Sequence, residues 1–205
     1  YNGSDDGLKD IFTVFVDRET NVLTYAPSYT QVDTFISINT DHYVKEQIID
    51  PLGKHEYEWD KCNGKDVVYI VNPNNPTGKL IDLDTILSLL KSNPDTLFVI
   101  DEAYYEFSRE SCAHLVIGHK NLIVTRTFSK AFGLAAVRLG YVIAHPDVLF
   151  HLRKIKNGKT VNAVAQLCGI AALNDLGYLN ARIDEMNDAK KFFIDNLSNK
   201  YTAVD

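Results

Sequence analysis

Lys130 is the residue whose type and setting first indicate chemistry. It directly follows Ser129, comes soon after the apolar run Leu122–Thr125 and precedes Ala131–Ala136, a segment rich in small residues. We expect such a lysine to be poorly placed for solvent, and a desolvated amine is a nucleophile toward carbonyl carbons. The alternative, which position alone leaves open, is a lysine that reaches solvent or pairs with a carboxylate.

Asp101 ends the apolar run Leu97–Ile100. A buried carboxylate without a partner costs several kcal/mol of desolvation, so it needs a cation nearby. A pyridinium nitrogen would serve, because an acidic group there keeps the ring protonated and able to accept electrons. An aspartate that caps a helix or pairs with an arginine is the alternative.

Arg138 lies eight residues beyond Lys130, across a turn that contains glycine. With Ser129 and the backbone amides after Gly3-Ser4 it could hold a phosphate. Guanidinium binds phosphate through two parallel hydrogen bonds, and a helix N-terminus adds oriented amides. The chain therefore carries parts that separately suit an aldehyde, a pyridinium ring and a phosphate.

The elements that must position these residues alternate between strand and helix. Apolar residues recur at helical spacing from near Asp5 and again over Leu83–Leu90. The tail predicts further helices near Asp147–Ile155, Val161–Leu173 and Tyr178–Asn199. Short apolar runs predict buried, mainly parallel strands over Val22–Tyr25, Val67–Val71, Leu97–Ile100, Leu122–Thr125 and Gly140–Ala144. We therefore expect an α/β fold with three layers, a mainly parallel central sheet flanked by helices, and a helical C-terminal tail.

Polar clusters follow three of the predicted strands. They are Asn72–Gly78, Asp101–Tyr104 and Thr127–Lys130. Open α/β sheets bind ligands outside the carboxyl ends of their strands. We therefore expect the three clusters to meet at one edge of the sheet.

Composition excludes several classes of function. The 205 residues carry 21 Lys and Arg against 27 Asp and Glu, a net charge of −6, which argues against a nucleic-acid partner. No apolar stretch approaches the roughly 18 residues that span a bilayer, so no membrane is expected. Cys62, Cys112 and Cys168 are widely separated, which favours a reducing, cytoplasmic setting.

A nucleotide-binding loop is a rival interpretation, because Gly158-Lys159-Thr160 resembles the end of a phosphate loop. The required glycine five residues earlier is Arg153, and no strand leads into the segment. No G-x-G-x-x-G motif is present in the sequence. Nucleotide binding is therefore not favoured, and no metal site is expected.

Taken together, the motifs resemble the fold-type I, pyridoxal 5′-phosphate-dependent aminotransferases of class I/II, and most closely their histidinol-phosphate aminotransferase subgroup. The resemblance extends from Asn2 to about Ala144 and more weakly beyond. Five motifs carry it in the right order: Asn2–Asp6, Ala26–Tyr29, Asn72–Gly78, Asp101–Phe107 and Arg126–Tyr141.

The resemblance assigns roles to the catalytic residues. It implies that Lys130 carries the cofactor as a Schiff base and later shuttles the substrate's proton. Asp101 would bind the pyridine nitrogen. Asn75 and Tyr104 would hydrogen-bond the phenolic oxygen of the cofactor, and the Asn75-Pro76 peptide bond is expected to be cis, as is frequent in the family.

The resemblance also assigns the rest of the cofactor site. Tyr29 would stack on the ring face, and Thr127 would assist. The phosphate would be held by Ser4, Asp5, Ser129 and Arg138.

The resemblance implies a division of the chain and the partners of the enzyme. Residues 1–155 would form the cofactor-binding large domain, and 156–205 a helical segment leading to a small domain. The family's N-terminal arm and its C-terminal small domain, which supplies an arginine for the substrate carboxylate, would lie outside this sequence. A homodimer with a small-molecule amino donor and a keto acceptor is expected.

Two alternatives stay open. One keeps the cofactor and changes the reaction, for example to decarboxylation of a phosphorylated amino acid. The other is a non-catalytic, truncated module kept for binding or dimerisation, against which the intact Lys130, Asp101 and Arg138 argue.

Overall fold

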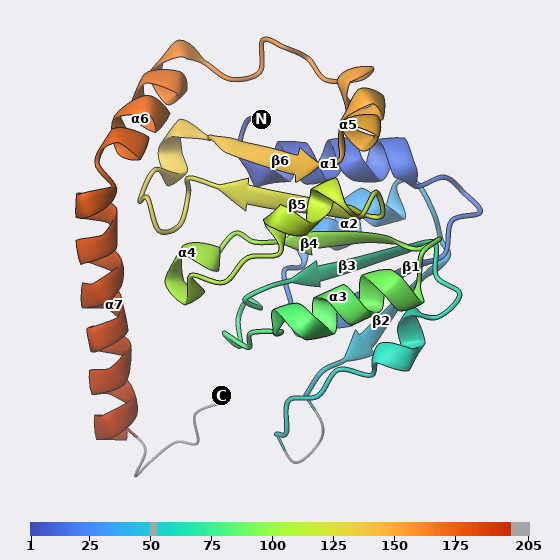
Figure 1. Ribbon diagram of the computed structural model, residues 1–205, viewed down its shortest axis with the longest axis horizontal. Helices are drawn as coiled ribbons and strands as arrows, with labels where there is room; N and C mark the ends of the chain where they lie inside the picture. Colours follow the sequence, from blue (N-terminus) through green and yellow to red (C-terminus); the bar gives the residue numbers. More distant parts are fainter. Residues whose placement is uncertain (50–52, 198–205) are drawn as a thin grey trace.

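A six-stranded sheet forms the centre of the molecule (Figure 1), as seen in a computed structural model that describes residues 1–49 and 53–197. The strand order is β2-β1-β3-β4-β5-β6, and β6 alone runs antiparallel to its neighbour β5. The strands are β1 (Val22–Ala26), β2 (Tyr43–Gln47), β3 (Val67–Val71), β4 (Leu97–Asp101), β5 (Leu122–Thr127) and β6 (Gly140–Ala144). The prediction of a mainly parallel sheet is confirmed.

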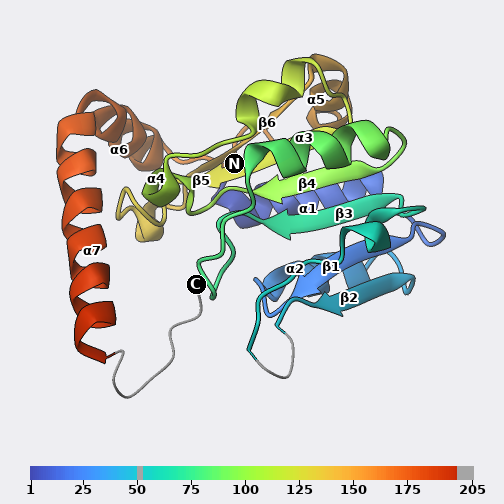
Figure 2. The ribbon, with the colours of Figure 1, turned by 60° about the horizontal axis from the view of Figure 1, so that its bottom comes forward.

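Helices cover both faces of the sheet (Figures 1 and 2). Alternate residues of β3 point to opposite sides: Tyr69 packs in the same buried cluster as residues of α1, α2 and α5, whereas Ile70 packs with residues of α3, η1 and η2. The three predicted layers are therefore present. The helices are α1 (Ser4–Phe15), α2 (Gln31–Ser37), α3 (Leu83–Ser92), α4 (Tyr105–Ser108) and α5 (Pro146–Arg153), and the short 3-10 turns are η1 (Trp59–Cys62), η2 (Ala113–Ile117) and η3 (Ala135–Val137).

Three strands or helices were absent from the sequence-based expectation, namely the edge strand β2 and the short helices α2 and α4. The edge strand β2 was not predicted, because Lys45 and Glu46 interrupt its apolar pattern and most of its side chains are exposed. The seven-residue helix α2 was also missed, since it is too short to display a full helical repeat. The five predicted strands are all present.

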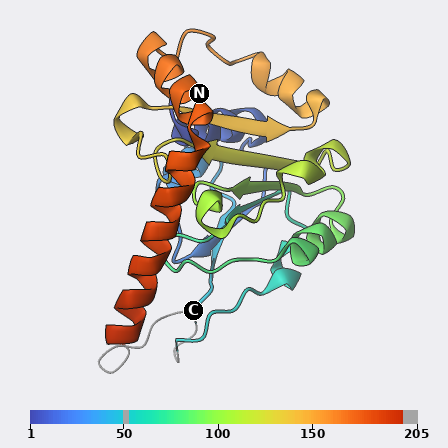
Figure 3. The same cartoon turned by 60° about the vertical axis from the view of Figure 1, so that its left-hand side comes forward.

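The two C-terminal helices lie to one side of the sheet (Figures 1 and 2), and in the view of Figure 3 the last of them crosses in front of it. These are α6 (Ala163–Asn174) and the 22-residue α7 (Leu176–Leu197), which replace the predicted ranges 161–173 and 178–199 with shifts of a few residues. Residues 198 and 199 lie outside the described range. Leu179 and Ile183 of α7 pack on Ala131 beside the lysine-bearing turn. The domain boundary at residue 155 stays a prediction.

The start of α1 lies against β6 at very close range. The amide of Gly140 donates to the Tyr1 carbonyl at 3.1 Å, and Gly3 caps the helix with a φ of 83°. A Cβ on Gly140 would lie 2.5 Å from both the Gly3 carbonyl carbon and the Ser4 nitrogen. Only glycine therefore allows β6 to approach the N-terminus of α1.

Gly140→Ala is expected to destabilise the fold, because the new methyl group meets backbone atoms that cannot rotate away. Overpacking of this kind costs roughly 1–3 kcal/mol, and urea unfolding followed by circular dichroism measures it. Gly158→Ala is the matched control, since nothing lies within 4 Å of its Cβ position. Equal stability of the two variants would show that the close approach does not constrain the fold.

Candidate active site

One pocket at the carboxyl edge of the sheet brings together all ten predicted site residues. Its volume is about 470 Å³, counting the open space at its mouth. Val71 and Ala103 complete the lining. The predicted residues that line it are Ser4, Asp5, Tyr29, Asn75, Asp101, Tyr104, Thr127, Ser129, Lys130 and Arg138.

Asp101 occupies the buried floor of this pocket, at the end of β4. Its side chain is 3% exposed and accepts hydrogen bonds from the Tyr69 hydroxyl at 2.9 Å, the Thr125 hydroxyl at 3.0 Å and the Ala103 amide at 3.2 Å. Among the described residues no Lys, Arg or His pairs with it. Burial therefore raises the pKa of Asp101 to about 6, despite the three donors. The alternatives of a helix cap or an arginine partner do not apply.

Lys130 lies at the mouth of the pocket, in the turn after β5. Its Nζ is 5.1 Å from the centroid of the Tyr104 ring, and no carboxylate within residues 1–49 and 53–197 pairs with it. The lysine is exposed rather than desolvated, so the expectation of poor access to solvent is wrong for this chain. The reason is geometric: the lysine follows the end of its strand, where the pocket opens.

Arg138 joins the two sides of the predicted phosphate site. Its Nη1 donates to the Ser129 hydroxyl at 3.3 Å and its Nη2 to the Asp5 carboxylate at 3.2 Å. The Thr127 hydroxyl donates to Ser129 at 3.0 Å. A Cβ on Gly3 would collide with this guanidinium, so glycine at the cap of α1 gives the arginine its place. Arg138, the two hydroxyl groups and the start of α1 thus line one pocket, and their binding of a phosphate stays a prediction.

Tyr29 and Asp5 interact directly. The Tyr29 hydroxyl donates to Asp5 at 2.7 Å, and burial is the main cause that raises the pKa of this tyrosine. Both oxygens of the carboxylate are therefore occupied, one by Tyr29 and the other by Arg138. Stacking of Tyr29 on a ring stays a prediction.

Asn75 and Tyr104 line the pocket from two different loops. Asn75 belongs to the loop between β3 and α3, and Tyr104 precedes α4. The Asn75-Pro76 peptide bond is cis, as are Ala26-Pro27 and Asn72-Pro73. Both residues thus line the same pocket as Asp101.

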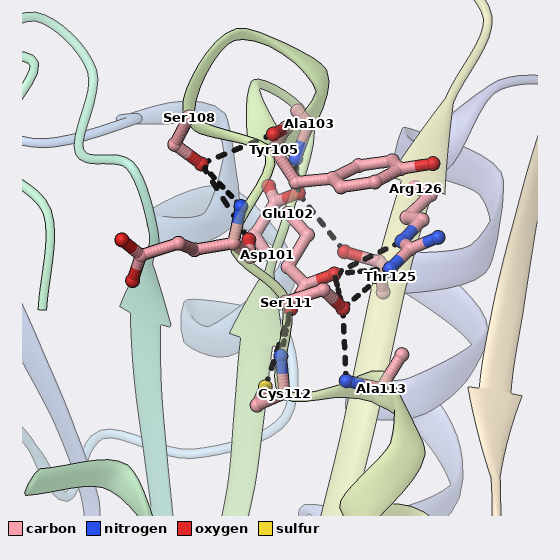
Figure 4. A network of polar contacts seen from close by, with 11 residues as sticks. Asp101, Glu102, Ala103, Tyr105, Ser108, Ser111, Cys112, Ala113, Thr125 and Arg126 are labelled. Carbon is pink, nitrogen blue, oxygen red and sulfur yellow. Dashed lines mark hydrogen bonds and ion pairs between the residues drawn. The ribbon is translucent and has the colours of Figure 1, made fainter. Parts of the chain in front are cut away.

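The Glu102–Arg126 pair is a feature that the sequence analysis did not single out (Figure 4). Arg126 donates to one oxygen of Glu102 through Nε at 2.9 Å and Nη2 at 2.8 Å, and its guanidinium lies 3.5 Å from the Tyr105 ring centroid. The Cys112 amide donates to the other oxygen at 2.7 Å. The pair ties β4 to β5 directly beside Asp101. A glutamate at the end of a buried strand was the available signal.

The pocket fits pyridoxal 5′-phosphate on observations of this structure alone. Asp101 is buried and has no cation beside it in the described structure, and a protonated pyridine nitrogen would supply one. Arg138 and the start of α1 offer donors to a phosphate, and Lys130 lines the same pocket with an amine that no described carboxylate pairs with. The sheet order and this site together define the pyridoxal-phosphate-dependent transferase fold.

Comparison with known proteins identifies the family. The sequence profile of "Aminotransferase class I and II" matches residues 1–204, and the chain belongs to that family. The family is pyridoxal-phosphate dependent, which agrees with the fit of the pocket.

Two curated relatives cover almost the whole chain. A dihydroxyacetone phosphate transaminase of Campylobacter jejuni is 37% identical over 99% of this chain and 56% of its own length. A histidinol-phosphate aminotransferase of Clostridium kluyveri is 33% identical over 96% of this chain and 57% of its own length. The chain thus spans little more than half the length of these relatives.

Two solved structures share the fold. A histidinol-phosphate aminotransferase of Sinorhizobium meliloti, in complex with pyridoxal 5′-phosphate, superposes with a TM-score of 0.82 at 26% identity and covers 93% of this chain and 53% of its own. The L-threonine-O-3-phosphate decarboxylase of Porphyromonas gingivalis has a TM-score of 0.83 at 25% identity, over 98% of this chain and 60% of its own.

The described part of the chain contains neither a metal-binding cluster nor a membrane-spanning helix. No group of three or more His, Cys, Asp or Glu is placed there to hold a metal ion. No helix there is long and apolar enough to cross a bilayer.

Asp101→Asn is expected to remove a pH dependence of stability in the cofactor-free chain. Because the folded pKa of about 6 lies above the unfolded value near 4, the folded state binds the proton more tightly, and stability falls as pH rises from about 4 to 6. The penalty above pH 6 is about 3 kcal/mol. Asparagine carries no charge, so the variant is expected to be the more stable protein at pH 7.5.

Urea unfolding at pH 4.5 and 7.5 measures both proteins. Asp184→Asn is the matched control, because that carboxylate is exposed on α7. An identical change with pH in the wild type and Asp101→Asn would contradict the assignment of the buried charge.

Proposed function

We propose that this chain is the cofactor-binding part of a pyridoxal-phosphate-dependent aminotransferase. It would move an amino group between an amino acid such as glutamate and a keto or phosphorylated acceptor. The observation that carries the proposal is the convergence of Lys130, Asp101 and Arg138 on one pocket from three separate segments. Membership of the aminotransferase family supports the reaction class.

Asp101 would control the ring end of the site. The bound cofactor supplies an aldehyde that combines with amines and a ring that accepts electrons from the substrate. A carboxylate buried among Tyr69, Thr125 and Ala103 gains its missing cation when it faces a protonated ring nitrogen. Asp101 would therefore hold a proton at that nitrogen.

Lys130 would bind the cofactor and then carry the substrate's proton. An amine that is not paired with a carboxylate is available both as nucleophile and as general base. Asn75 and Tyr104 would donate to the phenolic oxygen of the ring and stabilise its anionic form. Their presence in the lining of one pocket supports these roles.

The phosphate end would fix the orientation of the whole cofactor. Arg138 supplies charge, Ser129 and Thr127 supply hydroxyl groups, and the N-terminus of α1 supplies amides at Ser4 and Asp5. Anchoring far from the reacting carbon limits rotation and so holds the ring on Asp101.

A phosphorylated small molecule is the substrate class that we favour. The two curated relatives have names that refer to dihydroxyacetone phosphate and histidinol phosphate. The similarity to a phosphothreonine decarboxylase structure keeps decarboxylation as the second candidate. Incubation with glutamate separates the two, because only an aminotransferase converts the bound cofactor to its pyridoxamine form.

We also propose that the enzyme works as a homodimer in the cytoplasm. Large apolar side chains on α6, such as Leu167 and Ile170, are 68% and 58% exposed, which supports burial against another surface. Cys62, Cys112 and Cys168 are unpaired, which is typical of a reducing compartment. Sedimentation of the holoenzyme measures the oligomeric state.

Borohydride is expected to trap the cofactor on Lys130. Added pyridoxal 5′-phosphate should give a visible absorbance band that disappears on reduction, and peptide mapping should find the pyridoxyl group on the peptide that contains Lys130. Lys130→Ala should lose the adduct, whereas Lys154→Ala, at the exposed end of α5, should keep it. A pyridoxyl group spread over several lysines would contradict the proposed role.

Arg138→Gln is expected to weaken binding of the phosphorylated cofactor. Loss of a charge-assisted hydrogen bond to phosphate costs about 1.5–3 kcal/mol, or roughly 10- to 100-fold in Kd. Pyridoxal without phosphate should bind both proteins equally, and Arg153→Gln on α5 should behave as wild type. Titration of the visible absorbance provides the values, and an equal loss for both ligands would argue against a phosphate contact.

A further inference from the structure

Asn74 connects two loops that carry predicted cofactor contacts. Its side chain is 3% exposed and is fully engaged: its amide nitrogen donates to the Pro27 carbonyl at 3.0 Å, and its carbonyl accepts from the Ser28 hydroxyl at 2.7 Å. Tyr29 directly follows Ser28 in the sequence, and Asn75 directly follows Asn74. A substitution of Asn74 would therefore alter the distance between Tyr29 and Asn75.

Thr77 holds Asn74 in this position. The side-chain nitrogen Nδ2 of Asn74 also donates to the Thr77 hydroxyl at 2.9 Å. In the backbone, the Gly78 N–H donates to the Asn74 carbonyl at 2.7 Å, and the Asn74 N–H donates to the Lys79 carbonyl at 2.8 Å. The turn is thus closed by its own backbone, and the Thr77 hydroxyl offers a second contact to the rest of the chain, besides the contacts of the Asn74 side chain with Pro27 and Ser28.

His55 contacts that hydroxyl from a distant segment. Its Nε2 lies 3.0 Å from the Thr77 oxygen, and its ring packs on Tyr57 with centroids 5.5 Å apart. Its Nδ1 is buried and has no hydrogen-bond partner in the described structure. Burial of an unsatisfied nitrogen is unfavourable, so an apolar side chain would fill this place better if packing were its only role. Unlike an apolar side chain, the histidine can form a hydrogen bond with Thr77.

We propose that His55, Thr77 and Asn74 form a positioning relay that sets where Asn75 stands relative to Tyr29 in the cofactor pocket. The relay rests on the proposed function, since Asn75 is taken to donate to the phenolic oxygen of the cofactor. None of its three members lines the pocket that contains Lys130. They act through the loop that bears Asn75.

Thr77→Val and Thr77→Ser test the relay as a matched pair. Valine keeps the shape and removes the hydroxyl, whereas serine keeps the hydroxyl. Thr77→Val should raise the Kd for pyridoxal 5′-phosphate about three- to tenfold, as expected for one lost hydrogen bond. It should also raise the pH midpoint of the visible absorbance of the bound cofactor, because a phenolic oxygen that loses a donor keeps its proton to higher pH. Thr77→Ser should match the wild type in both.

His55→Leu and His55→Gln provide a second pair, outside the loop itself. Leucine should reproduce the effects of Thr77→Val, and glutamine, which can still bond the hydroxyl, should restore most of the wild-type values. His114→Leu, at an exposed histidine of η2, is the control and should change neither. If Thr77→Val fails to fold, the histidine pair decides.

The outcomes separate this inference from the proposed function. Weaker binding without a shift of the midpoint would overturn the relay, as would wild-type behaviour of Thr77→Val and His55→Leu. Failure of the wild-type chain to form an adduct on Lys130 would instead sink the proposed function. The relay is then tested in the cofactor-free chain, where Thr77→Val, unlike Thr77→Ser, should speed hydrogen exchange of the Gly78 amide about three- to tenfold.

Discussion

The site depends on one unbalanced charge at the end of β4. Asp101 is buried, receives three hydrogen bonds and still lacks a cation among the described residues, so burial raises its pKa to about 6. A buried charge without a counter-ion destabilises the fold, and a protonated ring nitrogen would offset this cost by supplying the missing charge. The other residues of the pocket would then serve to hold a ring against Asp101.

Glu102 shows how the same strand end treats a carboxylate that has a structural role. One residue beyond Asp101, it is 1% exposed, but Arg126 meets it with two nitrogens and Cys112 with a backbone amide. This paired charge ties β4 to β5 and fixes the distance between Asp101 and the turn that bears Lys130. The two adjacent carboxylates differ because they meet different neighbours: Asp101 bonds Tyr69 of one buried cluster, and Glu102 bonds Cys112 of the other and Arg126.

Continuous apolar runs made the central strands predictable, and polar clusters after them located the pocket. β3 (Val67–Val71) is buried at every position, and its uninterrupted apolar and aromatic residues predict a strand. β2 (Tyr43–Gln47) is a largely exposed edge strand that carries charged residues and shows no such pattern. Tyr69 was missed as a partner of Asp101, because a tyrosine within an apolar run predicts packing and its hydroxyl finds the aspartate only in three dimensions. The access of Lys130 to solvent depends on neighbours that spacing along the chain does not specify.

The phosphate end of the pocket is organised before any phosphate arrives. Asp5 accepts a hydrogen bond from Arg138 on one carboxylate oxygen and from Tyr29 on the other. The carboxylate thus balances the charge of the guanidinium and holds it beside Ser129. An incoming phosphate must share that guanidinium with a carboxylate of its own charge sign. The amides at the start of α1 offset the repulsion, because they donate to an anion without bringing a counter-charge of their own. Because Gly140 lies directly against that helix end, its close approach would also help to place these amides for an anion.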